Sequence, residues 1–300
     1  TVQAIIDEKK HDVKFFLTGS SARKLRRGQA NFLPGRIHMF FMTPLVASEL
    51  NFELNTDRAL ATGTLPGIYS EDDEYDRQKT LESYSAIYLQ EEIKSEALTR
   101  NIEGFTRFLQ ISAVTSTQFL DFNKLANEAQ INPQTARRYF EILQDTLIVH
   151  SLDAFAKSNR KRLVQHPRYF FFDNGVLNAL LGNFYATADR KGMLFENLFC
   201  TQVRHSLDSR DIKGYRLSSY RTEHGAEVDL IVEQPDGKIW AIELKSSANV
   251  GKSDLTGLKS FSKFIGKKHR SIVAYLGQKP QLIEDVEILP WQTCLKEMNL

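Results

Sequence analysis

The chain has 300 residues, of which 42% are hydrophobic and 25% charged, and its formal net charge is +2. This composition excludes a disordered chain and leaves room for two or three folded domains. A charge so close to zero gives no general attraction to nucleic acid, so phosphate contacts have to come from local basic patches. Cys200 and Cys294 lack metal-ligand or redox spacing, and no apolar run reaches the ~20 residues of a membrane span. We therefore expect a cytoplasmic protein with no membrane partner.

The first residues predict a short amphipathic helix and then a buried strand over 13–17. That strand ends in small hydroxyl residues, Thr18-Gly19-Ser20-Ser21. Nucleotide-binding α/β sheets place ligand contacts at such strand ends. The same serines also suit the N-cap of a helix that begins at Ala22. Both interpretations stay open on these residues alone.

The N-terminal stretch resembles part of the AAA-type ATPases of bacteria and archaea. The resemblance is carried by Phe16–Leu25, Leu33–Arg36, Thr43–Leu45 and Glu49–Leu50. It implies that Thr18 and Ser20 sense a nucleotide phosphate and that Arg36 acts as an arginine finger. A structural ion pair is the alternative for Arg36.

The Walker A and B motifs of such ATPases are absent from the sequence. The nearest P-loop pattern, Gly251-Lys252-Ser253, has Ser246 where the first glycine should stand. We therefore expect a C-terminal fragment that does not hydrolyse ATP by itself, with residues 1–45 as the end of the ATPase core and 46–112 as a helical lid and connector. ATP and oligomer formation then belong to the full-length protein.

Residues 113–172 carry the pattern of a winged helix-turn-helix. Apolar residues at helical spacing predict one helix over 122–129 and a second over 133–143. Asn132 is a suitable N-cap, and Pro133 then occupies the first helical position, which fixes where the second helix begins.

Arg137 and Arg138 fall on the exposed face of that second helix, where a recognition helix would contact nucleic acid. Residues 147–152 and 169–172 predict the wing hairpin, with Arg160–Arg162 at its tip. The same fold also packs between domains, so an unknown protein partner is the alternative to nucleic acid.

Residues 173–300 alternate between helical and strand patterns. We expect a long helix over 193–207, a strand over 215–221, strands over 227–233 and 239–245, a helix over 254–264 and a strand over 271–276. Helix, three strands, helix and strand is the order of a nuclease-like α/β core, and the whole chain is therefore expected to be a multi-domain α/β protein.

The two strands over 227–233 and 239–245 place acidic residues where apolar ones are expected. The reversal over 234–238 contains Pro and Gly and predicts a hairpin with Asp229 opposite Glu243. Carboxylates about 5 Å apart repel unless a cation or proton intervenes, and a divalent metal is the simplest such cation. The alternative is an exposed hairpin with a surface ion pair.

Asp229 followed by Glu243-Leu244-Lys245 resembles the PD-(D/E)xK nuclease core, and Glu196 matches the acidic helix residue of many such nucleases. The resemblance implies that Asp229 and Glu243 hold Mg²⁺ or Mn²⁺, that Glu196 orients the metal or water, and that Lys245 assists hydrolysis of a nucleic-acid phosphodiester.

The two resemblances together point to AAA-type ATPases whose C-terminal region is domain of unknown function 4143, with a nuclease-like fold. Whether the chain is an enzyme stays open. The alternative to a metal-dependent nuclease is a catalytically inactive module that binds DNA or protein and is regulated by ATP in the full-length protein.

Overall fold

The structure is a computed structural model that describes residues 40–88, 101–155 and 166–300, together with Val13, Phe15, Phe16, Thr18 and His38. Thr18 is exposed and lies in no helix or strand. The other predicted nucleotide-sensing residues, Ser20 and Arg36, lie outside the described residues, as do Arg160–Arg162.

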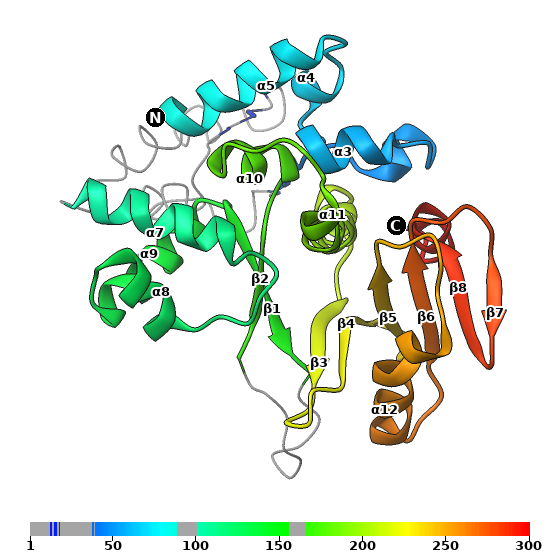
Figure 1. Cartoon of the computed structure of the whole chain (residues 1–300). Helices are drawn as coiled ribbons and strands as arrows, with labels where there is room; N and C mark the ends of the chain where they lie inside the picture. The colour runs from blue at the N-terminus through cyan, green and yellow to red at the C-terminus, as the bar shows by residue number, and fades with distance from the viewer. Residues whose placement is uncertain are drawn as a thin grey trace.

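A mixed sheet of eight strands forms the centre of the described chain (Figure 1). Its strands are β1 (Val149–Ala154), β2 (Arg168–Phe171), β3 (Arg216–Arg221), β4 (Glu227–Glu233), β5 (Ile239–Lys245), β6 (Arg270–Tyr275), β7 (Gln281–Ile283) and β8 (Val286–Pro290). The spatial order is β2-β1-β3-β4-β5-β6-β8-β7. The pairs β1–β3, β5–β6 and β6–β8 are parallel and the others antiparallel. The predicted α/β class is confirmed.

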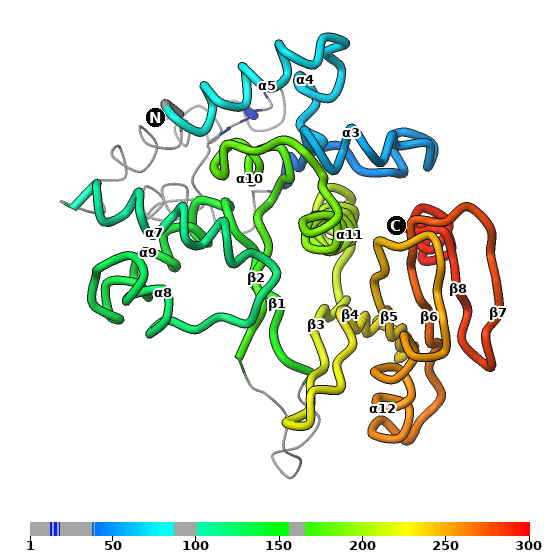
Figure 2. Tube along the Cα trace, viewed as in Figure 1, coloured from blue at the N-terminus to red at the C-terminus, as the bar shows by residue number. Residues whose placement is uncertain are grey.

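Ten α-helices accompany this sheet in the described residues. They are α3 (Thr56–Thr62), α4 (Pro66–Tyr69), α5 (Glu74–Ser83), α7 (Ile102–Val114), α8 (Phe122–Ala129), α9 (Pro133–Asp145), α10 (Asn174–Leu180), α11 (Ala188–Ser209), α12 (Thr256–Ile265) and α13 (Trp291–Glu297). Shorter helical turns are η1 (Ala47–Leu50), the π-helical η2 (Tyr84–Tyr88) and η3 (Lys252–Leu255). The trace in Figure 2 shows α7, α8 and α9 grouped beside β1 and β2.

Side chains that alternate along the central strands divide between two hydrophobic clusters. Val232 and Ile242 belong to the cluster that includes Phe199 of α11. Ile231 belongs to the second cluster, which includes Phe261 of α12. Because successive side chains of a strand point to opposite faces, α11 and α12 cover opposite faces of the sheet.

Two helices lie where the sequence predicts them: α8 has the expected bounds, and α9 begins at Pro133 as expected but continues two residues farther, to Asp145. The Asn132 side chain accepts a hydrogen bond from the backbone N of Thr135 at 2.7 Å, and Pro133 opens α9. β1 and β2 pair as the predicted hairpin, but β1 also pairs with β3. The sheet therefore continues across the predicted boundary between residues 113–172 and 173–300.

Three elements near the C-terminus have no counterpart in the sequence prediction: β7, β8 and α13. They extend the sheet beyond β6 and place Trp291 and Cys294 in the cluster on the α11 face. Among the described helices, none is both long and apolar enough to cross a bilayer.

Candidate acid cluster on the central sheet

The β4–β5 hairpin has the register that its turn predicts. Gln234 N donates to Lys238 O at 2.9 Å, and Gly237 has a φ of 83°, a backbone conformation that favours glycine. Four residue pairs run from Glu233–Ile239 to Leu230–Ile242. The ladder ends there, one pair short of Asp229 and Glu243.

A β-bulge in β4 changes the direction of Asp229. β3 and β4 pair at Ser218–Ile231 and again at Tyr220–Val228, so Asp229 and Leu230 together lie opposite Ser219. A bulge of this kind re-aims side chains and interrupts the alternation of faces. Regular alternation, on which the expected contact between Asp229 and Glu243 depends, therefore does not hold at Asp229.

The Asp229 carboxylate is buried and has two partners from other strands. Oδ1 lies 3.0 Å from Nη1 of Arg168 on β2, and Oδ2 accepts a hydrogen bond from the backbone N of Leu244 on β5 at 2.8 Å. Both side chains of the ion pair are 5% exposed. Asp229 thus joins the edge hairpin β1–β2 to the central strands.

Arg168 is the residue that the sequence prediction missed. Its Nη2 forms an ion pair with Glu196 on α11, and its Nε donates to the carbonyl of Thr117 at 2.7 Å. Burial alone would lower the pKa of Arg168, but the charges of Asp229 and Glu196 raise it, and the net shift is upward. A permanently charged guanidinium therefore lies between the two carboxylates.

Glu196 lies at the more open end of this cluster, with its side chain 25% exposed. Burial, followed by the nearby charge of Asp229, raises the pKa of Glu196 to about 7, and Arg168 opposes this shift. We call Arg168, Asp229 and Glu196 the arginine-acid cluster. It contains two acidic groups and one cationic group.

Glu243 and Lys245 share a face of β5, as predicted, and pair with each other. Lys245 Nζ lies 3.0 Å from Glu243 Oε1 and 3.7 Å from Asp254 Oδ1. The second oxygen of Glu243, Oε2, is buried without a hydrogen-bond partner. Burial and then the charge of Asp229 raise the pKa of Glu243 to about 9. Burial lowers the pKa of Lys245, but Glu243 raises it, and the net shift is upward.

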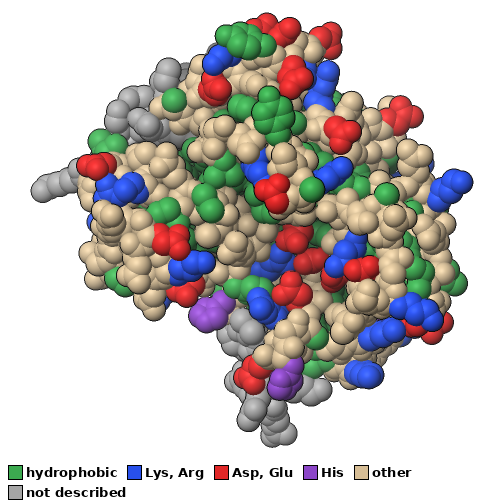
Figure 3. Space-filling view, in the orientation of Figure 1, with side chains coloured by type: hydrophobic (Ala, Val, Ile, Leu, Met, Phe, Trp, Pro, Cys, Tyr) green, Lys and Arg blue, Asp and Glu red, His purple; other side chains and the backbone are tan. Residues whose placement is uncertain are grey.

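The predicted metal-site residues divide between the arginine-acid cluster and the Glu243–Lys245 pair. On β5, Glu243 alternates with Ile242 and Leu244 of the α11-side cluster, whereas Glu196 comes from α11 itself. The described residues contain no group of three His, Cys, Asp or Glu side chains that could hold a metal ion. Figure 3 shows acidic and basic side chains side by side in the middle of this face. Arg168 already lies between Asp229 and Glu196, and Lys245 already lies against Glu243. As arranged, the acids therefore do not fit a divalent cation.

The two predicted nucleic-acid contacts lie on α9 and both are exposed. The guanidinium of Arg137 lies over the ring of Phe122, 4.5 Å from its centroid. Gln134 is exposed on the same helix, and Ala136 and Phe140 are buried. The exposed and buried faces of α9 are therefore those that the sequence predicts.

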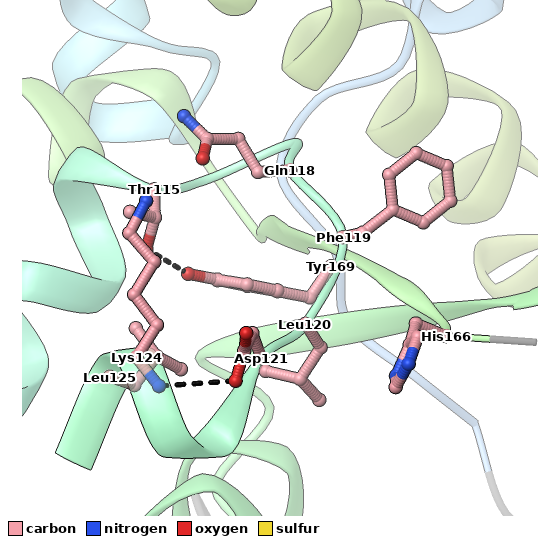
Figure 4. Close-up of a pocket in the computed structure, with 9 residues that line it drawn as sticks. All are labelled: Thr115, Gln118, Phe119, Leu120, Asp121, Lys124, Leu125, His166 and Tyr169. Atoms are coloured by element: carbon pink, nitrogen blue, oxygen red, sulfur yellow. Dashed lines mark hydrogen bonds between the residues drawn. The ribbon is translucent and has the colours of Figure 1, made fainter. Parts of the chain in front are cut away.

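A pocket of about 290 Å³ lies between α7, α8 and β2 (Figure 4). Its wall includes Tyr169, whose hydroxyl lies 2.6 Å from the Thr115 hydroxyl and also donates to the Ser112 carbonyl. The Tyr169 hydroxyl is thus already bonded within the protein.

Two family models match separate parts of the chain. One, described as Domain of unknown function (DUF8612), covers residues 54–187, and the other, described as Domain of unknown function (DUF4143), covers residues 191–294. The predicted resemblance to domain 4143 is confirmed for the C-terminal part, and that domain is often found with ATPases. Neither description names a nuclease.

The chain is also similar to two uncharacterized proteins, one from Mycobacterium bovis and one from Mycobacterium tuberculosis. Each is 23% identical over 251 residues, which make up 82% of this chain and 55% of the relative. The chain therefore spans about half the length of the curated relatives it matches.

Proposed function

We propose that residues 173–300 form a nuclease-like module of an ATPase-associated protein, and that this module does not cut nucleic acid in the conformation described. The observation that carries the proposal is the position of Arg168 between Asp229 and Glu196. Asp229 on β4 is one of the two acids proposed to hold the metal, and Glu196 on α11 is the acid proposed to orient the metal or water.

The chemistry of the guanidinium supports a non-cutting state. A divalent metal promotes hydrolysis because it lowers the pKa of a bound water and neutralises phosphate charge. A guanidinium offers only N–H donors and stays protonated, so it compensates the carboxylates without activating water. Lys245 is likewise paired with Glu243 and Asp254.

The test combines metal binding with cleavage. Calorimetric titration of the wild-type chain with Mn²⁺ should show no binding, and plasmid or single-stranded DNA should stay uncut with Mg²⁺ or Mn²⁺. Lys245→Ala should behave as the wild type does. Metal-dependent cleavage that disappears in Lys245→Ala would contradict the proposal and establish the alternative, a metal-dependent nuclease that uses Asp229, Glu243, Glu196 and Lys245.

A second function, duplex binding, is favoured by the exposed Arg137 and Arg138 on α9. Arg137→Ala with Arg138→Ala should weaken duplex binding and flatten its dependence on salt. Fewer phosphate contacts mean that fewer counterions leave the DNA when the protein binds. The matched control is Arg204→Ala with Arg210→Ala, which removes the same charge from exposed sites outside α9. An unchanged salt slope would leave α9 as a packing helix and a protein as the partner.

We propose that ATP acts on the longer protein and not on this chain alone. Thr18, Ser20 and Arg36 are proposed to sense nucleotide there, and the bound nucleotide would then regulate the C-terminal module. The support is the match to a domain often found with ATPases. Nucleotide added to this chain alone should change neither DNA binding nor thermal stability.

A further inference from the structure

Two glutamine side chains hold the segment that leads into α3 against the C-terminal part of the chain. Gln202 on α11 accepts a hydrogen bond from Ala47 N at 2.7 Å and donates one to Leu45 O at 2.9 Å. Gln292 on α13 accepts one from Leu54 N at 2.9 Å and donates one to Leu54 O at 3.0 Å. Each side-chain amide therefore bonds backbone groups of this segment with both its oxygen and its nitrogen.

We call residues 45–56 the strap. The residues proposed to sense nucleotide all precede it in the chain, and α11, to which Gln202 fastens it, also carries Glu196. We infer that the strap is the element through which the N-terminal part of the chain acts on the arginine-acid cluster. This inference rests on the proposed function, since it names the route by which nucleotide in the longer protein would reach the C-terminal module.

The strap is buried and has a strained backbone. Ala47 and Leu54 are 1% and 3% exposed and belong to the main hydrophobic cluster. Between them, Asn51 and Phe52 have φ values of 54° and 60°, a left-handed conformation that a bulky aromatic residue rarely adopts. Such a conformation persists only where surrounding contacts impose it. The hydrogen bonds to the two glutamines, one on either side of this turn, are contacts of that kind.

The two ends of the strap depend on each other. A buried backbone N–H or C=O that loses its partner costs the full penalty of leaving water, whereas a released strap regains hydrogen bonds with water. Loss of the hydrogen bonds to Gln292 therefore favours release from Gln202 as well, and release also relieves the strain at Phe52. We expect the strap to dock and undock as one unit.

Packed rings connect the strap to the arginine-acid cluster. Trp291 Nε1 donates to Thr56 Oγ1 at 3.0 Å, and the Trp291 ring lies edge-on to Phe195, with 6.4 Å between the centroids. Phe195 is fully buried and is the chain neighbour of Glu196, which pairs with Arg168. Displacement of the strap therefore disturbs the packing of Trp291 and, through Phe195, the part of α11 that carries Glu196.

The experiment measures amide hydrogen exchange in the full chain by NMR. Ala47 and Leu54 report on the strap. Leu244 reports on the cluster, because its N–H donates to Asp229 at 2.8 Å. The variant is Gln292→Met, which keeps the length of the side chain and removes its hydrogen bonds. After the change in global unfolding free energy is subtracted, we expect exchange at least about tenfold faster at Ala47 and Leu54, and about threefold faster at Leu244.

The three amides have to respond together. Faster exchange at Leu54 alone would show that the two glutamines form independent contacts, and this overturns the inference. Faster exchange in the strap without a change at Leu244 would show that the strap does not reach the cluster, and this overturns it too.

The matched control is Gln144→Met, the same substitution at a glutamine that donates to Ser151 Oγ at 2.7 Å outside the strap. After the same subtraction it should leave all three amides unchanged, and an equal acceleration there would overturn the inference. If Gln292→Met does not fold, Thr56→Val takes its place, because it removes only the hydroxyl that accepts from Trp291. Faster exchange at Leu244 in Thr56→Val supports the inference, and an unchanged rate overturns it.

Neither metal nor DNA enters this experiment. A strap that fails the test therefore leaves the proposed function standing. Metal-dependent cleavage would overturn the proposed function without any change in the exchange rates.

Discussion

Arg168 and Asp229 form a buried ion pair, with 3.0 Å between Nη1 and Oδ1, although they are 61 positions apart in the sequence. Glu196 shares the same guanidinium. Removing one member of a buried charge group is costly, because the remaining charges stay out of water without compensation. The stability of the described fold should therefore depend on Arg168 more than on an exposed arginine.

The first prediction concerns Arg168→Met. We expect the variant to lose about 3 kcal/mol of unfolding free energy at pH 8, because two carboxylates remain without a cation. The loss should be smaller near pH 5, where Glu196, whose pKa lies at about 7, is protonated. Urea unfolding at both pH values measures the difference.

Two further variants check the origin of that loss. Glu196→Gln added to Arg168→Met should recover part of the stability, because it removes one of the uncompensated charges. Arg204→Met is the control, since Arg204 is exposed and pairs with Asp208 at 2.7 Å, and it should cost under ~1 kcal/mol. Equal losses in Arg168→Met and Arg204→Met would contradict the importance of the buried cluster.

The second prediction concerns the pH dependence that Glu243 imposes. Burial and Asp229 raise its pKa to about 9 from a usual value of 4.5, so the folded chain binds an extra proton between these pH values. Stability should fall as pH rises through this window, and Glu243→Gln should remove that fall. At pH 8 the variant should be more stable than the wild type by about 1–3 kcal/mol.

Unfolding free energies between pH 7 and 9 test this prediction, because Glu196 contributes a slope of the same sign below pH 7. The control is Glu284→Gln, since a hydrogen bond from Lys259 lowers the pKa of Glu284. That variant should gain no stability at pH 8. A Glu243→Gln variant with the wild-type slope would show that Glu243 is charged in the folded chain at neutral pH.

Local signals in the sequence were sufficient to predict several elements. Asn132 and Pro133 together predict where α9 begins. The five-residue reversal over 234–238 predicts the register of β4 and β5. In both cases the deciding residues are neighbours in the chain. The face of α9 that carries Arg137 also followed from helical periodicity.

The centre of the site could not be predicted in the same way. The bulge at Asp229 depends on how β3 pairs with β4, and no residue of the hairpin encodes that shift. Arg168 comes from a strand far away in the sequence. One signal was nevertheless present: Arg168 opens a strand whose other residues are aromatic and buried, and a buried arginine requires a carboxylate partner.

The third prediction concerns the cap of α9. Asn132→Ala removes the side-chain acceptor for Thr135 N and should cost about 1 kcal/mol of unfolding free energy. Asn127→Ala, at an exposed position of α8, should change stability by under ~0.5 kcal/mol. If the proposed DNA contact at Arg137 and Arg138 holds, Asn132→Ala should also weaken duplex binding, because it loosens the start of α9.

The fourth prediction concerns the approach of α12 to β4. A Cβ added at Gly257 would lie 1.7 Å from the carbonyl oxygen of Glu227, a backbone atom that cannot turn aside. Gly257→Ala should therefore cost about 3 kcal/mol or more, because α12 has to move away from the sheet. Gly67→Ala is the matched control, since a Cβ there meets nothing within 4 Å, and it should be neutral or stabilising.

Because Glu227 begins the strand that carries Asp229, Gly257→Ala should also disturb the Arg168 ion pair, and its loss of stability should grow between pH 5 and pH 8. A loss that is the same at both pH values would show that α12 can shift without moving the acid cluster.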